Sequence, residues 1–488
     1  MPTDNNFIVA IELGSSKVTG IAGKKQPDGG IQILAVTQEP SAAFIRKGRI
    51  NNVMKMKTCI ANIKKKLEET LKKSINQTYV GVGGMGMHTV PNKITKNYSD
   101  KTMITEDIID SIHDENLQMQ SSERDILEAV TQEYKLGAQT TLEPVGIQTE
   151  SIEGHFLNVV TKKEVCDNIK TCFHEAGLDV VDIPITFLAL AENMLTEQQR
   201  LSGCAFVDMG SETTSVAVYK NGILRHLAVI PLGGENITRD IASLQIELSE
   251  AEQLKFNFGS ALTLENGETH TPIKLQRGDA VSYEEFAGLV EARQEEIIEN
   301  VAEQIKLSKL DKTQLIGGII VTGGASNMKN IDKAFAKYTG FDNITFVKSI
   351  NIPLRLSDAQ KNFNKDGAAN SAIALIEKGD ENCCGGELGE GQNELFPTKE
   401  KMERLKAQEE ARKLDEAKKK AEEEALQEQI RLKEEEEARL EAARQAEAER
   451  AAKREKRKAI FNRFKHWMDN LVSDKENYCY SLKPDYND

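Results

Sequence analysis

The sequence contains only one tryptophan among its 488 residues, and no apolar run approaches the ~20 residues that a membrane-spanning helix needs. Its seven cysteines show no spacing typical of metal ligands, and Cys383 and Cys384 are direct neighbours, which rarely share a metal. An odd number of cysteines, and an N-terminus that enters an apolar stretch at once, predict reduced thiols in the cytosol and no export signal.

The charge balance excludes another class of function. The formal net charge is −14, which argues against a protein that binds nucleic acid over a broad surface. Much of this charge lies in one C-terminal segment, so the remainder of the chain is less extreme. A chain of this length is too long for one simple core, and two or more domains are expected.

Two segments about two hundred residues apart share one pattern. Residues 8–23 and 205–219 each consist of an apolar strand, an acid, a glycine, hydroxyl side chains and a second apolar strand. This pattern predicts a β-hairpin with a polar turn. One such hairpin could be an ordinary surface turn, but two that face each other could hold a nucleotide from both sides.

The turns carry groups that suit a phosphate. Glycine brings the backbone close to a ligand, consecutive amides form an anion site, and hydroxyls and a lysine add donors. An acid at the strand end can hold a hydrated Mg²⁺ against phosphate oxygens, so Glu12 and Asp208 are the predicted metal residues. The predicted nucleotide contacts of the two turns are Gly14, Ser15, Ser16, Lys17, Gly210, Ser211, Glu212 and Thr213.

A third element is an apolar strand that runs into a glycine turn at Gly323, Gly324 and Ala325. Such a turn lets the backbone lie flat against a base or ribose and lets a helix begin facing the phosphates. Upstream, Glu252 and Lys255 lie at positions i and i+3 of a predicted helix. They could form a plain surface ion pair, or they could contact ribose and adenine.

The order of these motifs resembles the actin, sugar-kinase and chaperone ATPase superfamily, and within it most closely the FtsA family. In that family the hairpins are phosphate motifs, the glycine turn at 323–325 is the adenosine motif, and residues 231–238 open the second half, which adds Gly234 and Asn236 as nucleotide contacts. Residues 367–374 resemble the last connecting helix, and residues 130–146 resemble the small subdomain typical of FtsA. The similarity spans residues 5–378, with Glu12 where an aspartate is usual.

The resemblance implies an α/β fold, an actin-like two-domain ATPase fold with an inserted small α+β subdomain, and ATP and Mg²⁺ as cofactors. We predict the following parts: 5–200 first half, with 83–163 inserted; 201–378 second half; 379–398 linker; 399–458 charged spacer; 459–472 amphipathic helix; 473–488 tail. Helices are predicted around 56–75, near Glu106–Gln118 and at 284–310, and strands near Tyr134 and Phe156.

More than half of residues 399–458 are charged, and most of the rest are alanine, without glycine or proline. These are strong helix formers with many i,i+4 ion pairs, but the leucines keep no heptad. We predict a single solvated helix that acts as a stiff spacer, and a disordered charged tail is the alternative. A spacer of this length departs from the FtsA pattern.

The next segment, 459–472, is predicted to form an amphipathic helix preceded by the basic stretch 453–458. Its apolar face combines the only tryptophan with other large side chains and favours an anionic membrane surface, although docking on the protein itself is the alternative. The resemblance to FtsA implies a tether to the inner leaflet. The membrane-facing residues are Ile460, Phe461, Phe464, Trp467, Met468 and Leu471.

ATP hydrolysis in this superfamily needs a residue that orients the attacking water, and the matching position lies near Thr186, which cannot act as a base. Glu192, one to two turns further along the predicted helix, is a weak substitute. We therefore expect ATP binding with slow or negligible hydrolysis.

The resemblance implies an ATP-binding cell-division protein that polymerises on the cytoplasmic face of the inner membrane, as a peripheral protein at the septum. Its implied partners are the C-terminal tail of FtsZ, further copies of itself, an anionic membrane surface and other division proteins. The stretch 283–298 matches the FtsZ-binding region, with Glu291, Arg293 and Glu296 as partner residues. The alternatives are a PilM-like adaptor of pilus assembly and a small-molecule kinase of the same superfamily.

Overall fold

The computed structural model describes residues 6–118, 123–263, 271–356, 367 and 369–387. The spacer at 399–458, the amphipathic helix at 459–472 and the tail at 473–488 lie outside the described residues. The described part belongs to one compact unit. Among its helices, none is long and apolar enough to cross a membrane.

The first half is built on a six-stranded sheet with the order β12-β7-β1-β2-β3-β20. Strands β1 to β3 form an antiparallel meander, whereas β7 and β12 add in parallel on the other side of β1. The bounds of the strands are β1 Ile8–Leu13, β2 Lys17–Lys25, β3 Ile31–Pro40, β7 Gln77–Gly81, β12 Asp179–Asp182 and β20 Leu354–Arg355.

The second half repeats this arrangement. Strands β13, β14 and β15 form the antiparallel meander, and β18 and β19 add in parallel beside β13. The two meanders and their parallel neighbours therefore have the same order, which confirms the predicted repeat. The strands are β13 Cys204–Met209, β14 Thr214–Lys220, β15 Ile223–Ile230, β18 Ile319–Thr322 and β19 Ile344–Phe346.

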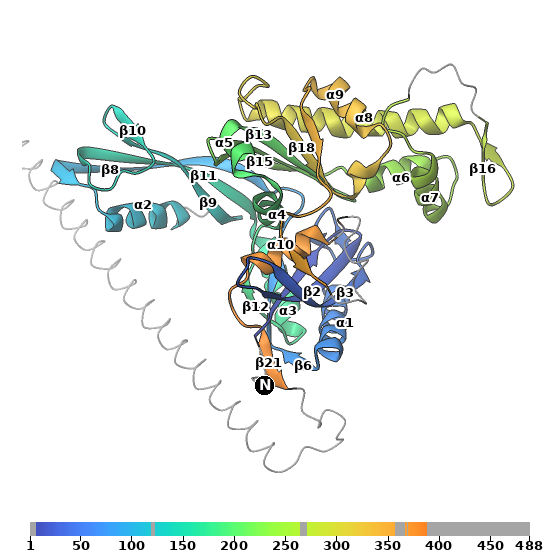
Figure 1. Ribbon diagram of the computed structural model, residues 1–488, viewed down its shortest axis with the longest axis horizontal. Helices are drawn as coiled ribbons and strands as arrows, with labels where there is room; N and C mark the ends of the chain where they lie inside the picture. Colours follow the sequence, from blue (N-terminus) through green and yellow to red (C-terminus); the bar gives the residue numbers. More distant parts are fainter. Residues whose placement is uncertain (1–5, 119–122, 264–270, 357–366, 368, 388–488) are drawn as a thin grey trace, which may run out of the picture. The chain divides into compact units, whose positions relative to one another are not determined.

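Helices cover both sheets (Figure 1). In the first half α1 and α3 pack on one face, and α4 and α10 pack on the other; their bounds are α1 Val53–Leu71, α3 Lys163–Glu175, α4 Thr186–Met194 and α10 Asn370–Lys378. The second half carries α5 Glu197–Ser202, α6 Gly234–Ala242, α7 Leu248–Phe258, α8 Tyr283–Leu307, the short 3₁₀ helix η1 Gly324–Asn327 and α9 Ile331–Thr339. Three short strand pairings lie outside the two main sheets: β4 Ile45–Arg46 with β5 Arg49–Ile50, β16 Ile273–Lys274 with β17 Ala280–Val281, and β6 Lys73–Ile75 with β21 Cys384–Glu387.

One hydrophobic cluster includes residues of both halves, because α4 and α10 lie between the sheets. The rings of Phe187 on α4 and Phe206 on β13 stack with centroids 5.3 Å apart, and both side chains are buried. Leu190 of α4 and Ile373 of α10 are buried in the same cluster, together with Ile320 of β18. Burial of this apolar surface holds the halves side by side and so fixes the position of the two hairpin turns.

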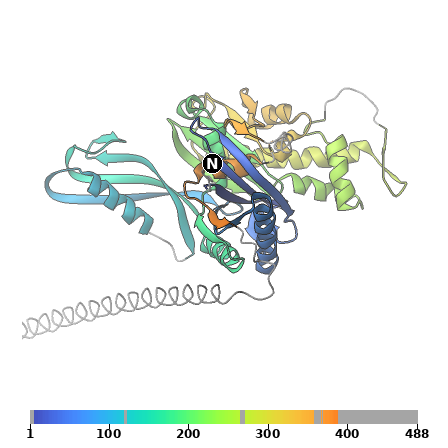
Figure 2. The same ribbon diagram turned by 60° about the horizontal axis from the view of Figure 1, so that its bottom comes forward.

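The predicted inserted subdomain is present, with helix α2 at Glu106–Gln118, as predicted, against one face of long strands (Figures 1 and 2). Its strands are β8 His88–Met103, β9 Arg124–Leu136, β10 Gln139–Thr141 and β11 Gln148–Lys162. These strands extend the second-half sheet, because β8 pairs with β15 at His88 and Ala228. The sequence places this insert in the first half, whereas its sheet continues that of the second half.

Two predicted boundaries are wrong. The helix predicted at 56–75 ends at Leu71, because Lys72 adopts a left-handed conformation with φ of 56° and the chain continues as β6. The linker, which was predicted to begin at residue 379, begins later in the structure, because β21 pairs with β6 and Cys383 is fully buried. The hydroxyl of Tyr79 accepts hydrogen bonds from the amides of Asp380 and Glu381, which secures this segment to the first half.

Candidate functional site

The first hairpin turn joins β1 to β2 and is held by the loop after β3. The hydroxyl of Ser41 donates to the carbonyl of Gly14 at 2.6 Å, and its amide donates to the carbonyl of Ser16. The hydroxyl of Ser15 accepts a hydrogen bond from the Gly48 amide at 2.9 Å. A side chain at Gly14 would lie only 2.6 Å from the Lys17 carbonyl, so the tight turn requires glycine.

The second hairpin turn joins β13 to β14 and is held by the start of α6. The amide of Gly234 donates to the Gly210 carbonyl at 3.1 Å, and the amide of Glu235 donates to the Ser211 carbonyl at 2.7 Å. Gly233, the residue before α6, leaves no room for a side chain, since a Cβ there would lie 2.5 Å from the Ser211 carbonyl. The first amides of α6 are therefore directed at the turn that we predict to bind phosphate.

The glycine turn after β18 lies against the second hairpin. Gly323 has φ of 95°, and a Cβ there would overlap the Met209 carbonyl and lie 2.5 Å from Asp208 Oδ1. Ala325 lies beside Gly234, with its Cβ 3.2 Å from the position that a Cβ of Gly234 would take. The structure thus brings together the second hairpin, the start of α6 and the predicted adenosine motif.

Lys255 of α7 completes this side of the site. Its Nζ donates to the Gly234 carbonyl at 3.1 Å and to the Thr238 hydroxyl at 2.8 Å, and it pairs with Glu252 at 2.7 Å. The Lys255 side chain is only 11% exposed, so this is not a plain surface ion pair. The predicted pair exists, and it lies where the glycine turn, α6 and α7 meet.

The two acids of the hairpins lie close enough to influence each other. Burial and the Asp208 carboxylate raise the pKa of Glu12 to about 7, against the opposing effect of Lys17. Burial raises the pKa of Asp208 to about 6. A divalent ion beside these two carboxyls would stabilise the charged form of both.

The donor set fits a magnesium ion that is held mainly by a ligand. Among the described residues no group of three or more His, Cys, Asp or Glu side chains could hold a metal ion by itself. Mg²⁺ commonly binds through one or two carboxylates together with water and substrate phosphates. Glu12 and Asp208 therefore fit the metal role only if a phosphate-bearing ligand supplies further oxygens.

Glu212 has a different environment from the one that the sequence suggests. Its buried carboxylate accepts hydrogen bonds from the Lys47 amide at 2.6 Å, from Arg46 at 2.9 Å and from Arg239 at 2.7 Å. Burial alone would raise its pKa, but these three donors outweigh burial and hold the pKa below its usual value. Because both oxygens are engaged, we assign Glu212 to the connection between the two halves instead of to nucleotide contact.

Two further candidates also have internal partners. The side-chain oxygen of Asn236 accepts a hydrogen bond from the Gly233 amide at 3.0 Å, so it closes the first turn of α6. Glu192 forms an ion pair with Lys378 at 2.5 Å. The residue beside the first hairpin is instead Thr186, whose hydroxyl lies against Gly81, the strand partner of Glu12.

The predicted partner residues on α8 are engaged within the chain. Arg293 binds both carboxylate oxygens of Asp240 on α6, at 2.5 and 3.1 Å, and also contacts Glu296. Glu291 accepts a hydrogen bond from the Thr263 amide at 2.9 Å. A charged peptide that binds here has to compete with these contacts.

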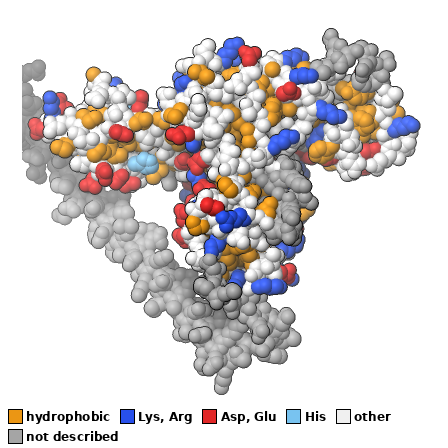
Figure 3. All heavy atoms as spheres, in the orientation of Figure 1, with side chains coloured by type: hydrophobic (Ala, Val, Ile, Leu, Met, Phe, Trp, Pro, Cys, Tyr) orange, Lys and Arg blue, Asp and Glu red, His pale blue; other side chains and the backbone are white. Residues whose placement is uncertain are grey.

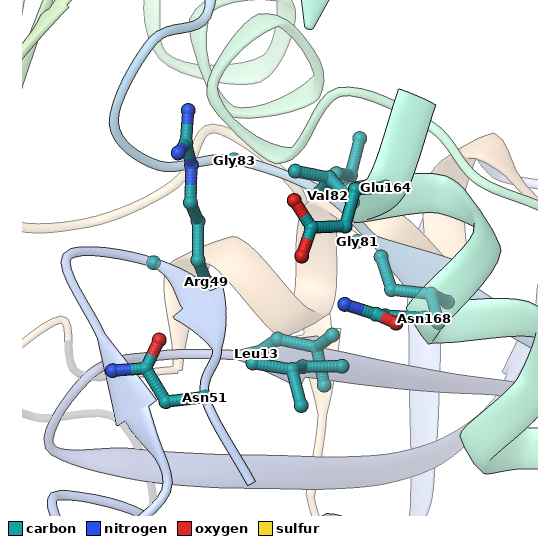
Figure 4. A pocket seen from close by; sticks show the side chains of 12 residues that line it. Leu13, Arg49, Asn51, Gly81, Val82, Gly83, Glu164 and Asn168 are labelled. Carbon is teal, nitrogen blue, oxygen red and sulfur yellow. The ribbon is translucent and has the colours of Figure 1, made fainter. Parts of the chain in front are cut away.

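Sequence reasoning missed the loop that connects β4 to β5. Arg46, Lys47 and Gly48 contact both hairpins, through Glu212 and Ser15. Three basic residues around a glycine directly after a strand are a signal that could have indicated this loop. Beside it lies a cavity of about 140 Å³ lined by Leu13, Arg49, Gly81–Gly83 and Glu164, among others (Figure 4).

Comparison with known proteins identifies relatives of the chain. The family described as cell division protein FtsA matches residues 205–375. The FtsA of Porphyromonas gingivalis is 28% identical over 69% of this chain and 71% of its own length. The FtsA of Escherichia coli is 27% identical over 79% of this chain and 93% of its own length.

A solved structure is similar in fold. The PilM–PilN type IV pilus biogenesis complex matches with a TM-score of 0.52 and 14% identity, and covers 77% of this chain and 98% of that chain. At this identity the likeness shows the fold alone, which is the actin-like α/β fold. The resemblance to FtsA and the fold class predicted from the motifs are therefore both confirmed.

Proposed function

We propose that this chain, a relative of the FtsA cell-division proteins, binds ATP and Mg²⁺ between its two halves and anchors division filaments at the membrane. The observation that carries the proposal is the arrangement of two like hairpins with adjacent acids and a glycine turn against the second. The proposal rests on this geometry together with the similarity to the FtsA proteins of several bacteria.

The residues have distinct roles in this proposal. The backbone amides of both turns, the hydroxyls of Ser15, Ser16 and Thr213, and Lys17 bind the phosphates. Glu12 and Asp208 hold Mg²⁺, partly through water. Gly323, Gly324 and Ala325 lie along the adenosine, and Lys255 and Glu252 contact the ribose or base. A negatively charged phosphate near the first turn of α6 is further stabilised by the helix dipole.

Hydrolysis in this proposal is slow or negligible. Thr186 occupies the position beside the first hairpin and cannot take a proton from water, while Glu192 is paired with Lys378. We expect the chain to bind ATP, and we expect phosphate release to be much slower than nucleotide exchange. A phosphate-release assay on the full-length chain tests this, and the substitution Thr186→Glu should raise the rate if that position faces the attacking water.

The proposed surface for the FtsZ tail lies on α6, α7 and α8. Helix α7 exposes Leu248 by 53% and Phe256 by 70%, and both α7 and α8 pack against α6. Figure 3 shows hydrophobic side chains among charged ones at this end of the second half. An acidic peptide group could replace Asp240 on Arg293, and the apolar residues of the tail could cover Phe256.

Binding of a labelled FtsZ tail peptide tests this surface. Arg293→Gln should weaken binding at least tenfold, because it removes the charge that a peptide carboxylate would meet. Arg277→Gln is the matched control, since Arg277 is an exposed arginine paired with Asp279. Equal affinity of the two variants would remove Arg293 from the proposed surface.

Membrane attachment is proposed to depend on residues 459–472, which lie outside the described residues. Deletion of residues 454–472 should abolish sedimentation of the full-length chain with anionic vesicles and leave ATP binding intact. Ordered filaments on anionic lipid monolayers in the presence of ATP would support self-assembly at the membrane. A deletion variant that binds vesicles as the full-length chain does would exclude this anchor.

A further inference from the structure

The structure contains a second polar cavity, outside the proposed nucleotide contacts, where the two halves meet. Its volume is about 500 Å³. It is lined by Arg46, Lys47, Arg49, Asn51 and Met85 of the first half and by Glu212, Glu235, Arg239 and Leu248 of the second. Cavities of this size typically accommodate small molecules.

The charge of this lining is unbalanced. Four of the nine residues are basic and two are acidic. Both acids are already engaged, since Glu212 binds Arg46 and Arg239, and Glu235 lies 3.5 Å from Arg239. No ion pair among the described residues includes the side chain of Lys47 or Arg49.

Arg49 is in an unusual position for a charged side chain. Its Nε is buried and has no hydrogen-bond partner within the described part of the chain. One guanidinium nitrogen lies against Gly86. Arg49 lines both cavities, and Figure 4, which draws the smaller one, shows its side chain extending away from Leu13 and Asn51. A buried guanidinium donor without an acceptor is unfavourable and is normally satisfied by protein, water or ligand.

We propose that this cavity binds a small phosphate-bearing anion, through Lys47 and Arg49 with support from Arg46. Arginine presents parallel donors that match phosphate oxygens, and lysine adds a point charge. The cavity is larger than a phosphate group, and Leu248 and Met85 form an apolar wall, so a small organic phosphate fits better than free phosphate. Because the lining comes from both halves, the bound anion would also connect them.

This site does not depend on ATP binding by the hairpins. The residues proposed for the anion, Lys47, Arg49 and Arg46, are not among the proposed nucleotide contacts. Glu212 lies between the two sites, since it is part of the second hairpin turn and also lines the cavity. An anion that competes for Arg46 would weaken the contact of Glu212 with the first half.

The test uses the full-length chain, with isothermal titration of inorganic phosphate and, separately, of glycerol 3-phosphate. Glycerol 3-phosphate should bind more tightly than inorganic phosphate, which distinguishes an organic phosphate site from a plain ion site. Lys47→Met and Arg49→Gln should each weaken binding at least tenfold. The matched controls are Lys55→Met and Arg277→Gln, which remove exposed charges outside the cavity.

Outcomes of this test are decisive in either direction. Absence of binding of both compounds to the wild-type chain, or unchanged affinity in Lys47→Met, would overturn the proposal. Among the described residues the side chain of Lys47 forms no hydrogen bond or ion pair, so Lys47→Met keeps the test valid even if Arg49→Gln fails to fold. ATP binding is measured in parallel, and it should stay within twofold in both variants. If the wild-type chain binds glycerol 3-phosphate but not ATP, the anion site stands and the proposed nucleotide function fails.

Discussion

The two hairpins have the same strand order, an acid at the matching position (Glu12 or Asp208) and a glycine turn, yet they are held in different ways. The first turn is secured by the loop of its own half, through Ser41 and Gly48. The second turn receives the first amides of α6, lies against Gly323 and extends Glu212 to the other half. The comparison teaches that one motif can serve two purposes: both turns suit phosphate, but only the second also connects the adenosine side and the opposite half.

Substitution of Gly323, the glycine that lies against the second hairpin, is expected to have the largest effect on ATP binding and stability. Gly323→Val should abolish detectable ATP binding and destabilise the fold by about 3 kcal/mol or more, because its φ and the overlap with Met209 and Asp208 exclude a side chain. Gly288→Val is the control, since a Cβ at this position of α8 meets open space and lies outside the proposed nucleotide contacts. Nucleotide titration and thermal unfolding measure both effects, and normal ATP binding by Gly323→Val would contradict the proposed adenosine motif.

The acids of the two hairpins should make Mg²⁺-dependent ATP binding sensitive to pH. The pKa of Glu12 is raised to about 7 and that of Asp208 to about 6, so protons compete with the metal below these values. Affinity should fall by up to about tenfold per pH unit for each carboxyl below its pKa. Titration at several pH values between about 5.5 and 8 measures this fall.

The same raised pKa values predict how the free energy of unfolding of the nucleotide-free chain depends on pH. Between the usual pKa of about 4.5 and the raised value of about 7 the folded state binds more protons than the unfolded state, so stability should decrease as pH rises through this window. Glu12→Gln should remove the part of this slope that lies between pH values of about 6 and 7, where Asp208 no longer titrates, and should also reduce the effect of Mg²⁺ on ATP binding. An unchanged pH slope in this variant would show that Glu12 is not the group responsible.

The contact between the halves should contribute an intermediate effect. Glu212→Gln should destabilise the chain by about 2 kcal/mol, because Arg46 and Arg239 lose their shared carboxylate. Since the pKa of Glu212 is lowered, its contribution is present above the usual pKa and is lost as pH falls through the lowered value. Glu235→Gln is the control, because it removes the longer ion pair of 3.5 Å between Glu235 and Arg239. Denaturant unfolding at neutral and acidic pH measures the stability of both variants.

The smallest effect is expected at the first turn. Ser41→Ala should destabilise the chain by about 1 kcal/mol, because one hydrogen bond to the Gly14 carbonyl is lost while the amide contact to Ser16 remains. ATP affinity should change by less than about threefold. A loss of ATP binding as large as that of Gly323→Val would contradict the difference between the two turns.

Much of this arrangement follows from local pattern. The apolar-acid-glycine pattern predicted both hairpins, and the i,i+3 spacing predicted the Glu252–Lys255 pair, which the structure contains. Helix α2 was predicted with its observed bounds because amphipathic spacing is a strong local signal.

What the sequence could not supply depends on distant partners. The ion pair of Glu212 requires Arg46, which lies on a strand of the other half. The end of α1 and the position of β21 depend on the pairing of β21 with β6. The insert joins the second-half sheet through a single bridge at Ala228, which no local pattern indicates. Such long-range pairings decide the role of a side chain after its local structure is set.

The most direct test of the account is calorimetric titration of the full-length chain with ATP, with and without Mg²⁺, beside the variant Asp208→Asn. We expect one ATP per chain, tighter binding with Mg²⁺, and loss of that Mg²⁺ dependence in the variant. Absence of ATP binding by the wild-type chain in the presence of Mg²⁺ would contradict the claim that the two hairpins enclose a nucleotide.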